Sequence, residues 1–158
     1  MKILLAVDGS VFGEEAAREV ARRPWPEGSE VKVISAVEPV YVPAAEPWGL
    51  PAGYFVNLDK LADDRARSTV EAALRLLSDR EGAPLKVSTA RPCGPARQVI
   101  VEEAERWGAD LVVLGSHGYG FWNRLLLGSV SQAVASHAPC TVEIVKRPRP
   151  AEGGVKDG

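Results

Sequence analysis

Short apolar runs alternate along the chain with longer stretches in which apolar residues recur every three or four positions. The short runs predict five β-strands, over residues 1–7, 30–37, 85–90, 110–114 and Thr141–Val145. The run at 110–114 is the most aliphatic, which favours a central strand buried on both faces. The run at 85–90 alternates apolar and polar side chains, as a strand near the edge of a sheet does.

The stretches between these runs predict α-helices. Their apolar stripes favour one helix from Ser10 to the prolines at 24 and 26, and others over residues 58–80, 95–107 and 129–137. Ser10 is the expected N-cap of the first helix, and Gly108 is expected to end the third. Residues 40–56 are expected to form a long loop, because their prolines and glycines are excluded from a helix interior and from a central strand.

This alternation predicts an α/β fold with a five-stranded parallel sheet and helices on both faces. Residues 1–146 are expected to form a single domain, and residues 147–158 a flexible C-terminal tail. Ligands of such folds bind outside the carboxyl ends of the strands, where the strand order reverses. The first and fourth strands are the natural flanks of that point, and Asp8 and Gly115 lie at their carboxyl ends.

Composition and charge exclude several partners. The chain has 19 basic and 21 acidic residues and a net charge of −2, which gives no field to attract nucleic acid or an anionic membrane surface. No apolar run reaches the roughly 18 residues of a membrane span and no secretory signal is evident, so we expect a soluble cytoplasmic protein. Cys93 and Cys140 form no metal or disulfide pattern and are expected to be free thiols, buried or half-buried.

A glycine- and serine-rich segment follows the fourth predicted strand, and its chemistry suits a phosphate group. Glycine lets the backbone approach an anion closely, which Gly118 and Gly128 can provide. Ser129, Val130 and Ser131 begin the last predicted helix. The free N–H groups and the positive dipole end of that helix favour an anion, and the two hydroxyls add donors.

Each of these residues also has a purely structural interpretation. Asp8 is placed to meet a ribose hydroxyl or a phosphate-bound Mg²⁺, but it can equally form an Asx-turn with Ser10 or cap the first helix. Ser129 can be a helix N-cap, and the glycines can serve turns alone. His117 is more simply a loop histidine that hydrogen-bonds the backbone than a catalytic base.

The glycine-rich segment resembles the signature of the ATP-binding universal stress proteins. That family carries Gly-x2-Gly-x9-Gly-(Ser/Thr), and four residues match it with no gap adjusted: Gly115, Gly118, Gly128 and Ser129. Other segments are also similar to the family, at 3–10, 109–118, 127–131 and 139–142, so that the resemblance covers residues 1–146. It implies a Rossmann-like fold of the adenine nucleotide alpha hydrolase type, with strand order 3-2-1-4-5.

The resemblance also implies a ligand, a set of site residues and an assembly. The ligand is ATP, or ADP or AMP, with Mg²⁺ held through the nucleotide at Asp8. The implied nucleotide-binding residues are Ala6, Asp8, Ala36, Val37, Gly115, His117, Gly118, Gly128, Ser129, Val130 and Ser131. Among them, Ala36 and Val37 present their peptide groups to the adenine edge. The implied assembly is a homodimer joined through Thr141–Val145, a strand whose exposed edge would invite pairing.

The expected function is an ATP-binding module for stress response or signalling, with slow or no hydrolysis. Phosphoryl transfer needs charge neutralised on the γ-phosphate, whereas the segment has no lysine after its glycines and Arg124 is its one cation. The alternatives are a slow ATPase, a nucleotide-free interaction module of the same fold, and a flavodoxin-like or electron-transfer-flavoprotein-like domain. The loop at 40–56 and the aromatic residues 119–122 are interpreted as a lid or a partner surface.

Overall fold

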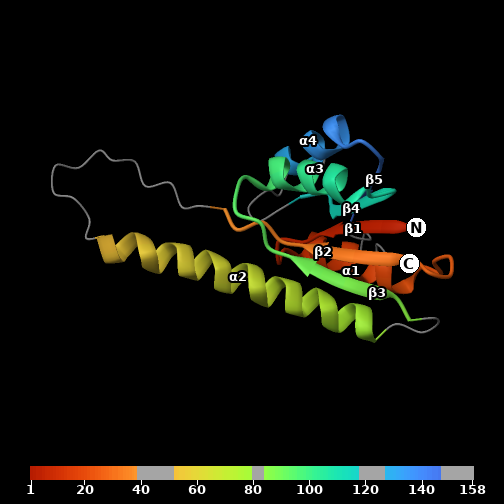
Figure 1. The fold of residues 1–158 in the computed structure, drawn as a ribbon, viewed down its shortest axis with the longest axis horizontal. Helices are drawn as coiled ribbons and strands as arrows, with labels where there is room; N and C mark the ends of the chain where they lie inside the picture. Colours follow the sequence, from red (N-terminus) through yellow and green to blue (C-terminus); the bar gives the residue numbers. More distant parts are fainter. Residues whose placement is uncertain (39–51, 80–83, 118–126, 147–158) are drawn as a thin grey trace, which may run out of the picture.

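Five parallel strands form a single sheet in the computed structural model, which describes residues 1–38, 52–79, 84–117 and 127–146, with the backbone alone for 52–57. The strands are β1 (Lys2–Ala6), β2 (Glu30–Ile34), β3 (Lys86–Ala90), β4 (Leu111–Gly115) and β5 (Thr141–Val145). Their order is β3-β2-β1-β4-β5, and all neighbouring strands are parallel (Figure 1). The predicted α/β class and strand order are therefore confirmed.

The helices of the described residues cover both faces of this sheet. They are α1 (Val11–Arg22), α2 (Ala52–Ser78), α3 (Ala96–Trp107) and α4 (Ser129–His137). Helices α1 and α2 pack on one face, and α3 and α4 pack on the other (Figure 1). In the parts of the chain that the structure describes, no helix combines the length and the apolar character needed to cross a membrane.

Strand β1 is buried on both faces and separates two hydrophobic cores. Ile3 and Leu5 belong to the core beneath α1 and α2, whereas Leu4 and Ala6 belong to the core beneath α3 and α4. This double burial explains why residues 3–7 are all apolar, since a strand covered on one face alone would alternate. The chain moves outward from β1 to β3 and returns to β4 on the other side of β1, so the strand order reverses there.

Strand β2 is shorter than predicted. It ends at Ile34, whose carbonyl accepts the hydrogen bond of Val7 N–H at 3.0 Å, and not at residue 37. Val37 instead forms an isolated parallel bridge with Cys93, because the chain beyond Ile34 leaves β1 and follows the segment after β3.

Helix α2 begins earlier than predicted. It starts at Ala52, inside the segment that its prolines and glycines suggested to be a loop. Gly53 lies in the first turn, where backbone N–H groups have no acceptor within the helix, so the helix-breaking argument does not apply to it. The remainder of that segment, 40–51, and the expected tail at 147–158 lie outside the described residues.

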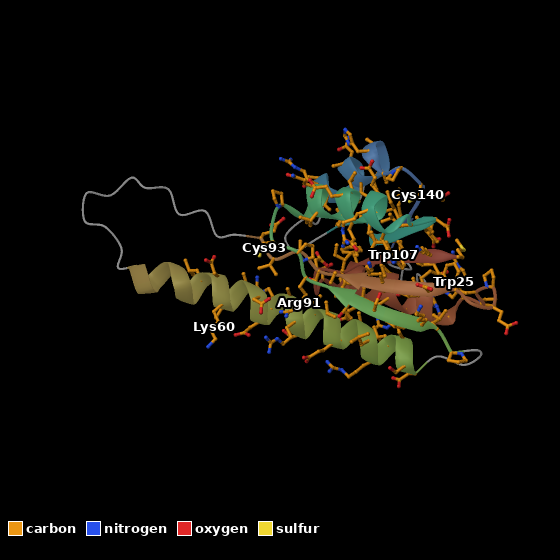
Figure 2. The ribbon with its side chains drawn as sticks, in the orientation of Figure 1. Trp25, Lys60, Arg91, Cys93, Trp107 and Cys140 are labelled. Atoms are coloured by element: carbon orange, nitrogen blue, oxygen red, sulfur yellow. The ribbon has the colours of Figure 1, made fainter. Side chains whose placement is uncertain are left out.

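The two cysteines lie in distant parts of the fold (Figure 2). Both are free thiols, as predicted, and Cys140 is half-buried. Burial raises the pKa of the Cys140 thiol. The prediction of burial is wrong for Cys93, which is exposed because it lies in the connection between β3 and α3, outside both cores.

A buried ion pair links α3 to the sheet. Lys32 Nζ of β2 lies 2.8 Å from Glu103 Oε1, and the guanidinium of Arg106 also contacts the Glu103 carboxylate. The ammonium group of Lys32 sits 4.6 Å from the ring centre of Trp107, which lies between α3 and the sheet (Figure 2). Burial raises the pKa of Glu103, but hydrogen bonds from Lys32 and Arg106 outweigh it and hold that pKa below its ordinary value.

We expect this pair to make the free energy of unfolding depend on pH. Because the pKa of Glu103 is lower in the folded protein than in the unfolded chain, its contribution is present at pH 7 and is lost as the pH falls through the lowered value. Glu103→Gln should reduce the free energy of unfolding by about 1–3 kcal/mol at pH 7. Urea titrations should show the difference from the wild type shrinking between about pH 5 and about pH 3.

Glu105→Gln is the matched control, because Glu105 is exposed on the same helix. Its effect should stay within about 0.5 kcal/mol at every pH. A Glu103→Gln deficit that remained constant down to the acid end of the titration would show that the carboxylate charge is not what stabilises this contact.

Candidate functional site

A cleft of about 530 Å³ opens at the carboxyl ends of β1, β2 and β4. It lies at the reversal of strand order, between α2 on one side and α3 and α4 on the other. Most of the predicted site residues line it: Ala6, Asp8, Ala36, Gly115, His117, Gly128, Ser129, Val130 and Ser131. Its volume is that of a pocket for a small molecule of nucleotide size. Gly118, like Arg124 and the aromatic residues 119–122, lies outside the described residues.

Asp8 forms the turn that joins β1 to α1. Its Oδ1 accepts hydrogen bonds from the backbone N–H of Ser10 at 3.0 Å and from Ser10 Oγ at 2.6 Å. Ser10 caps α1 as predicted, with its Oγ accepting from Gly13 N–H at 3.2 Å. The Asx-turn interpretation of Asp8 is thus correct, and it does not exclude a ligand, because the carboxylate is exposed at the cleft.

Gly115 is required by packing between α1 and β4. A Cβ atom at this position would lie 2.6 Å from the carbonyl carbon of Phe12, 2.7 Å from its Cβ and 2.8 Å from its oxygen. The ring of Phe12 also packs against that of His117, with 5.3 Å between centroids. Gly115 therefore admits α1 close to the end of β4, a role that the phosphate-cradle interpretation did not identify.

The two ends of the glycine-rich segment are fastened together. Gly128 N–H donates to the carbonyl of Ser116 at 2.9 Å, and Ser131 Oγ lies 3.0 Å from the same oxygen and 2.9 Å from the carbonyl oxygen of Gly128. Ser131 is only 2% exposed. Its hydroxyl, predicted to be a phosphate donor, is thus engaged by main-chain carbonyls and positions the start of α4.

The start of α4 presents free backbone donors to the cleft. Gly128 is the N-cap and has no side chain to cap the helix. The first helical hydrogen bond runs from Gln132 N–H to the carbonyl of Gly128 at 2.9 Å. Among the described residues, the N–H groups of Ser129, Val130 and Ser131 therefore have no acceptor, and all three residues line the cleft. Such N–H groups and the positive helix end favour an anion.

The end of β2 differs from the prediction for Val37. Its N–H donates to the carbonyl of Pro92 at 2.9 Å, its carbonyl accepts from Gly94 N–H at 3.0 Å, and Val37 is not among the described residues that line the cleft. Ala36 is half-buried and lines the cleft, and its peptide groups form no hydrogen bond with the part of the chain that the structure describes. The backbone contact predicted for this pair therefore rests on Ala36.

His117 and Glu38 have structural partners at the rim of the cleft. His117 Nδ1 lies 3.1 Å from Ser116 Oγ. Glu38 Oε1 accepts from the N–H of Ala96 at 2.9 Å and so caps α3. No group of three His, Cys, Asp or Glu side chains suited to a metal ion occurs in the described ranges.

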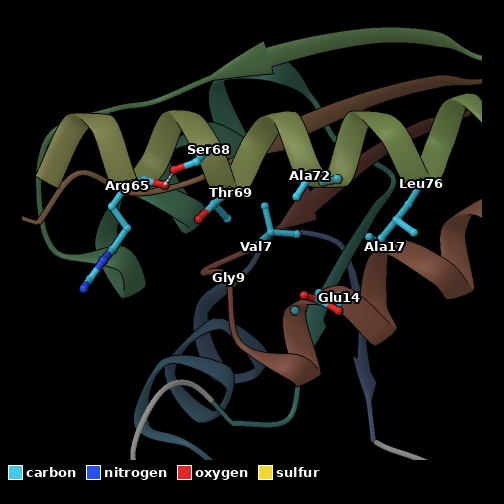
Figure 3. A pocket seen from close by; sticks show the side chains of 11 residues that line it. Val7, Gly9, Glu14, Ala17, Arg65, Ser68, Thr69, Ala72 and Leu76 are labelled. Carbon is cyan, nitrogen blue, oxygen red and sulfur yellow. Dashed lines mark hydrogen bonds between the residues drawn. The ribbon is translucent and has the colours of Figure 1, made fainter. Parts of the chain in front are cut away.

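Sequence reasoning missed one wall of the cleft. Helix α2 contributes Leu58, Leu61, Ala62, Arg65, Ala66 and Thr69. Arg65 also lines an adjoining hollow of about 250 Å³ between α1 and α2 (Figure 3). The spacing of these positions is helical, so the stripe was visible in the sequence, but nothing in it identified the surface that the stripe faces.

Known proteins resemble the chain over almost its whole length. The sequence model described as the universal stress protein family matches residues 1–146. The universal stress protein MJ0531 of Methanocaldococcus jannaschii is 33% identical over 150 residues, which make up 94% of this chain and 83% of that protein.

Solved structures share the fold. The hypothetical protein MJ0577 superposes with a TM-score of 0.77 at 26% identity, covering 94% of this chain and 97% of that one. A universal stress protein in complex with cAMP gives 0.61 at 20% identity, with 92% and 96% covered. An Arabidopsis thaliana family protein with AMP bound gives 0.59 at 17% identity, with 96% and 97% covered. At these identities, the last two establish a common fold and nothing more for this chain.

The packing at Gly115 predicts a specific loss of stability. Gly115→Ala should lower the free energy of unfolding by about 1–3 kcal/mol, because its Cβ would overlap backbone atoms of Phe12 that cannot move independently. Gly128→Ala is the control, since its Cβ would lie 3.2 Å from Ser116 O and needs only a small adjustment. Urea unfolding of both variants measures the difference, and equal losses would contradict this account of Gly115.

Proposed function

Because the chain belongs to the universal stress protein family, we propose that its cleft binds an adenine nucleotide and that ATP with Mg²⁺ is the ligand. The observation that carries this proposal is the first turn of α4, where three backbone N–H groups without acceptors among the described residues line the cleft. The complexes of two proteins of the same fold, one with AMP and one with cAMP, support an adenine nucleotide as the class of ligand.

The cleft suggests an orientation for the nucleotide. The phosphates lie at Ser129, Val130 and Ser131, where the helix end favours negative charge. The ribose or a phosphate-bound Mg²⁺ meets the exposed carboxylate of Asp8. The adenine lies toward Ala36, whose peptide groups are left to bond its edge.

We propose that the bound nucleotide acts as a conformational ligand in a cytoplasmic stress-response or signalling module, and that hydrolysis is slow or absent. Of the described residues that line the cleft, none is a lysine, and Arg65 is the one with a permanent positive charge. Efficient phosphoryl transfer requires a positioned water and charge neutralisation at the γ-phosphate. The intact Gly-x2-Gly-x9-Gly-Ser spacing favours this proposal over a nucleotide-free interaction module.

We also propose that two chains associate through β5. In the described residues this strand pairs with β4 alone, which leaves its other edge to a second copy. The strand is held firmly, because Arg23 donates to both carboxylate oxygens of Glu143 at 2.7 Å and so ties β5 to the end of α1. An ordered edge of this kind can add a strand from a neighbour.

Calorimetric titration with ATP and Mg²⁺ tests the nucleotide proposal, and Asp8→Asn sharpens it. Asparagine keeps an oxygen that can accept from Ser10, so the turn and the melting temperature should be unchanged. The loss of charge should weaken ATP binding about tenfold, since hydrogen bonds to charged groups contribute roughly 1.5–3 kcal/mol.

The same titrations without Mg²⁺ separate the two roles of Asp8. A loss that requires Mg²⁺ assigns the carboxylate to the metal, whereas a loss in both conditions assigns it to the ribose. Absence of heat and of a thermal shift for the wild type, with and without Mg²⁺, would refute nucleotide binding.

The assembly proposal predicts a mass of two chains in solution. Sedimentation equilibrium at micromolar concentration should give a dimer with two-fold symmetry, as expected of an isologous interface. A monomeric mass under these conditions would argue against pairing through β5.

A further inference from the structure

One charged residue of the cleft is not explained by the family signature. Arg65 lies on α2, on the same helical stripe as Leu58, Leu61, Ala62 and Thr69. In Figure 3 its side chain leaves the helix beside the hollow that Val7 and Gly9 also line. It therefore lies at the junction of the main cleft and this hollow, next to the end of β1.

The guanidinium of Arg65 has no acidic partner among the described residues. The nearby acid of its own helix, Asp63, is instead paired with Arg67 and with Arg91, which follows β3. Glu14, which shares the hollow, pairs with Arg18 at 3.2 Å. The carbonyl of Arg65 accepts a hydrogen bond from Ser68 Oγ at 3.1 Å, whereas its guanidinium forms none with the described residues.

The surrounding charges make this cation important for an anionic ligand. Asp8 and Glu38 are the acidic residues among the described lining of the cleft, and Arg65 is the one described lining residue with a permanent positive charge. Without Arg65, the formally charged side chains of this described lining would all be acidic and would disfavour a polyphosphate. A guanidinium remains charged at any physiological pH, and its planar donors match two phosphate oxygens at once.

Arg65 and the start of α4 approach the cleft from opposite faces of the sheet. Helix α2 packs with α1 on one face, and α4 packs with α3 on the other. A single phosphate bound at Ser129 to Ser131 would contact only the donors at the start of α4. A chain of phosphates can extend from there across the ends of β1 and β4 toward α2. The two groups of donors can then hold opposite parts of the same phosphate chain.

We propose that Arg65 is a specificity-determining residue that makes the cleft select ADP and ATP over AMP, cyclic AMP and adenosine. This inference rests on the proposed nucleotide binding and adds the class of nucleotide to it. Arg65 contributes through the terminal phosphates, while the base and the ribose are bound by other residues.

Isothermal titration of adenosine, AMP, ADP and ATP against three proteins tests the inference. These are the wild type, Arg65→Gln and Arg75→Gln. Arg75 is the matched control, because it is exposed on the same helix, and neither the cleft nor the adjoining hollow includes it. Melting temperatures without ligand should agree for all three proteins, since neither side chain bonds to another of the described residues.

The expected result is a loss that grows with the number of phosphates. Arg65→Gln should weaken ATP binding by about tenfold to a hundredfold, the range for a hydrogen bond to a charged group. AMP should lose no more than about threefold, adenosine should be unaffected, and Arg75→Gln should match the wild type. Added salt should weaken ATP binding more steeply in the wild type than in Arg65→Gln.

Three other results would overturn the inference, and they can be told apart. Equal losses for adenosine and ATP would assign Arg65 to the nucleoside or to the fold. An unchanged ATP affinity in Arg65→Gln, with binding by the wild type intact, would reject Arg65 alone. No binding of any nucleotide by the wild type would reject the proposed function and this inference together.

Discussion

The burial of β1 on both faces is the constraint on which the rest of the structure depends. A strand with apolar side chains on both sides needs helices above and below it, and parallel neighbours require crossover connections. The chain satisfies both requirements by adding β2 and β3 on one side of β1 and then crossing to the other side of β1 to add β4. The polar cleft is a direct result, because that return leaves the carboxyl ends of two buried strands adjacent to each other.

The cleft is formed largely by backbone geometry. Gly115 allows α1 to approach β4, Asp8 and Ser10 shape the turn from β1 to α1, and Ser131 sets the start of α4. In each case the side chain, or its absence, positions main-chain groups. The sequence singled out these residues, but it did not reveal the packing of Gly115 against Phe12 or the contact of Ser131 with the Ser116 carbonyl, because both depend on neighbours that are distant in the chain.

This distinction explains what the sequence could predict. The alternation of apolar runs and amphipathic stretches was sufficient for the elements and the fold class, and the resemblance supplied the strand order. The Gly115 to Ser129 spacing led to the edge of the sheet at which the cleft opens. The predicted end of β2 was wrong, because the chain leaves β1 after Ile34 to pair with the segment that follows β3, and the sequence does not show that pairing. Arg65 was missed because helical periodicity shows which residues share one face of α2, but not which other elements or which cleft that face borders.

The fastening of Ser116 to Gly128 and Ser131 has a consequence for how this protein can vary. Two hydrogen bonds to the carbonyl of Ser116, from Gly128 N–H at 2.9 Å and from Ser131 Oγ at 3.0 Å, hold the two ends of the glycine-rich segment together, independently of the residues between them. The entropy of closing a loop rises only slowly with its length, so insertions or exchanges between these anchors cost little. Related chains could therefore diversify that segment, as antibodies diversify loops on a constant framework, while the amino end of α4 keeps its place.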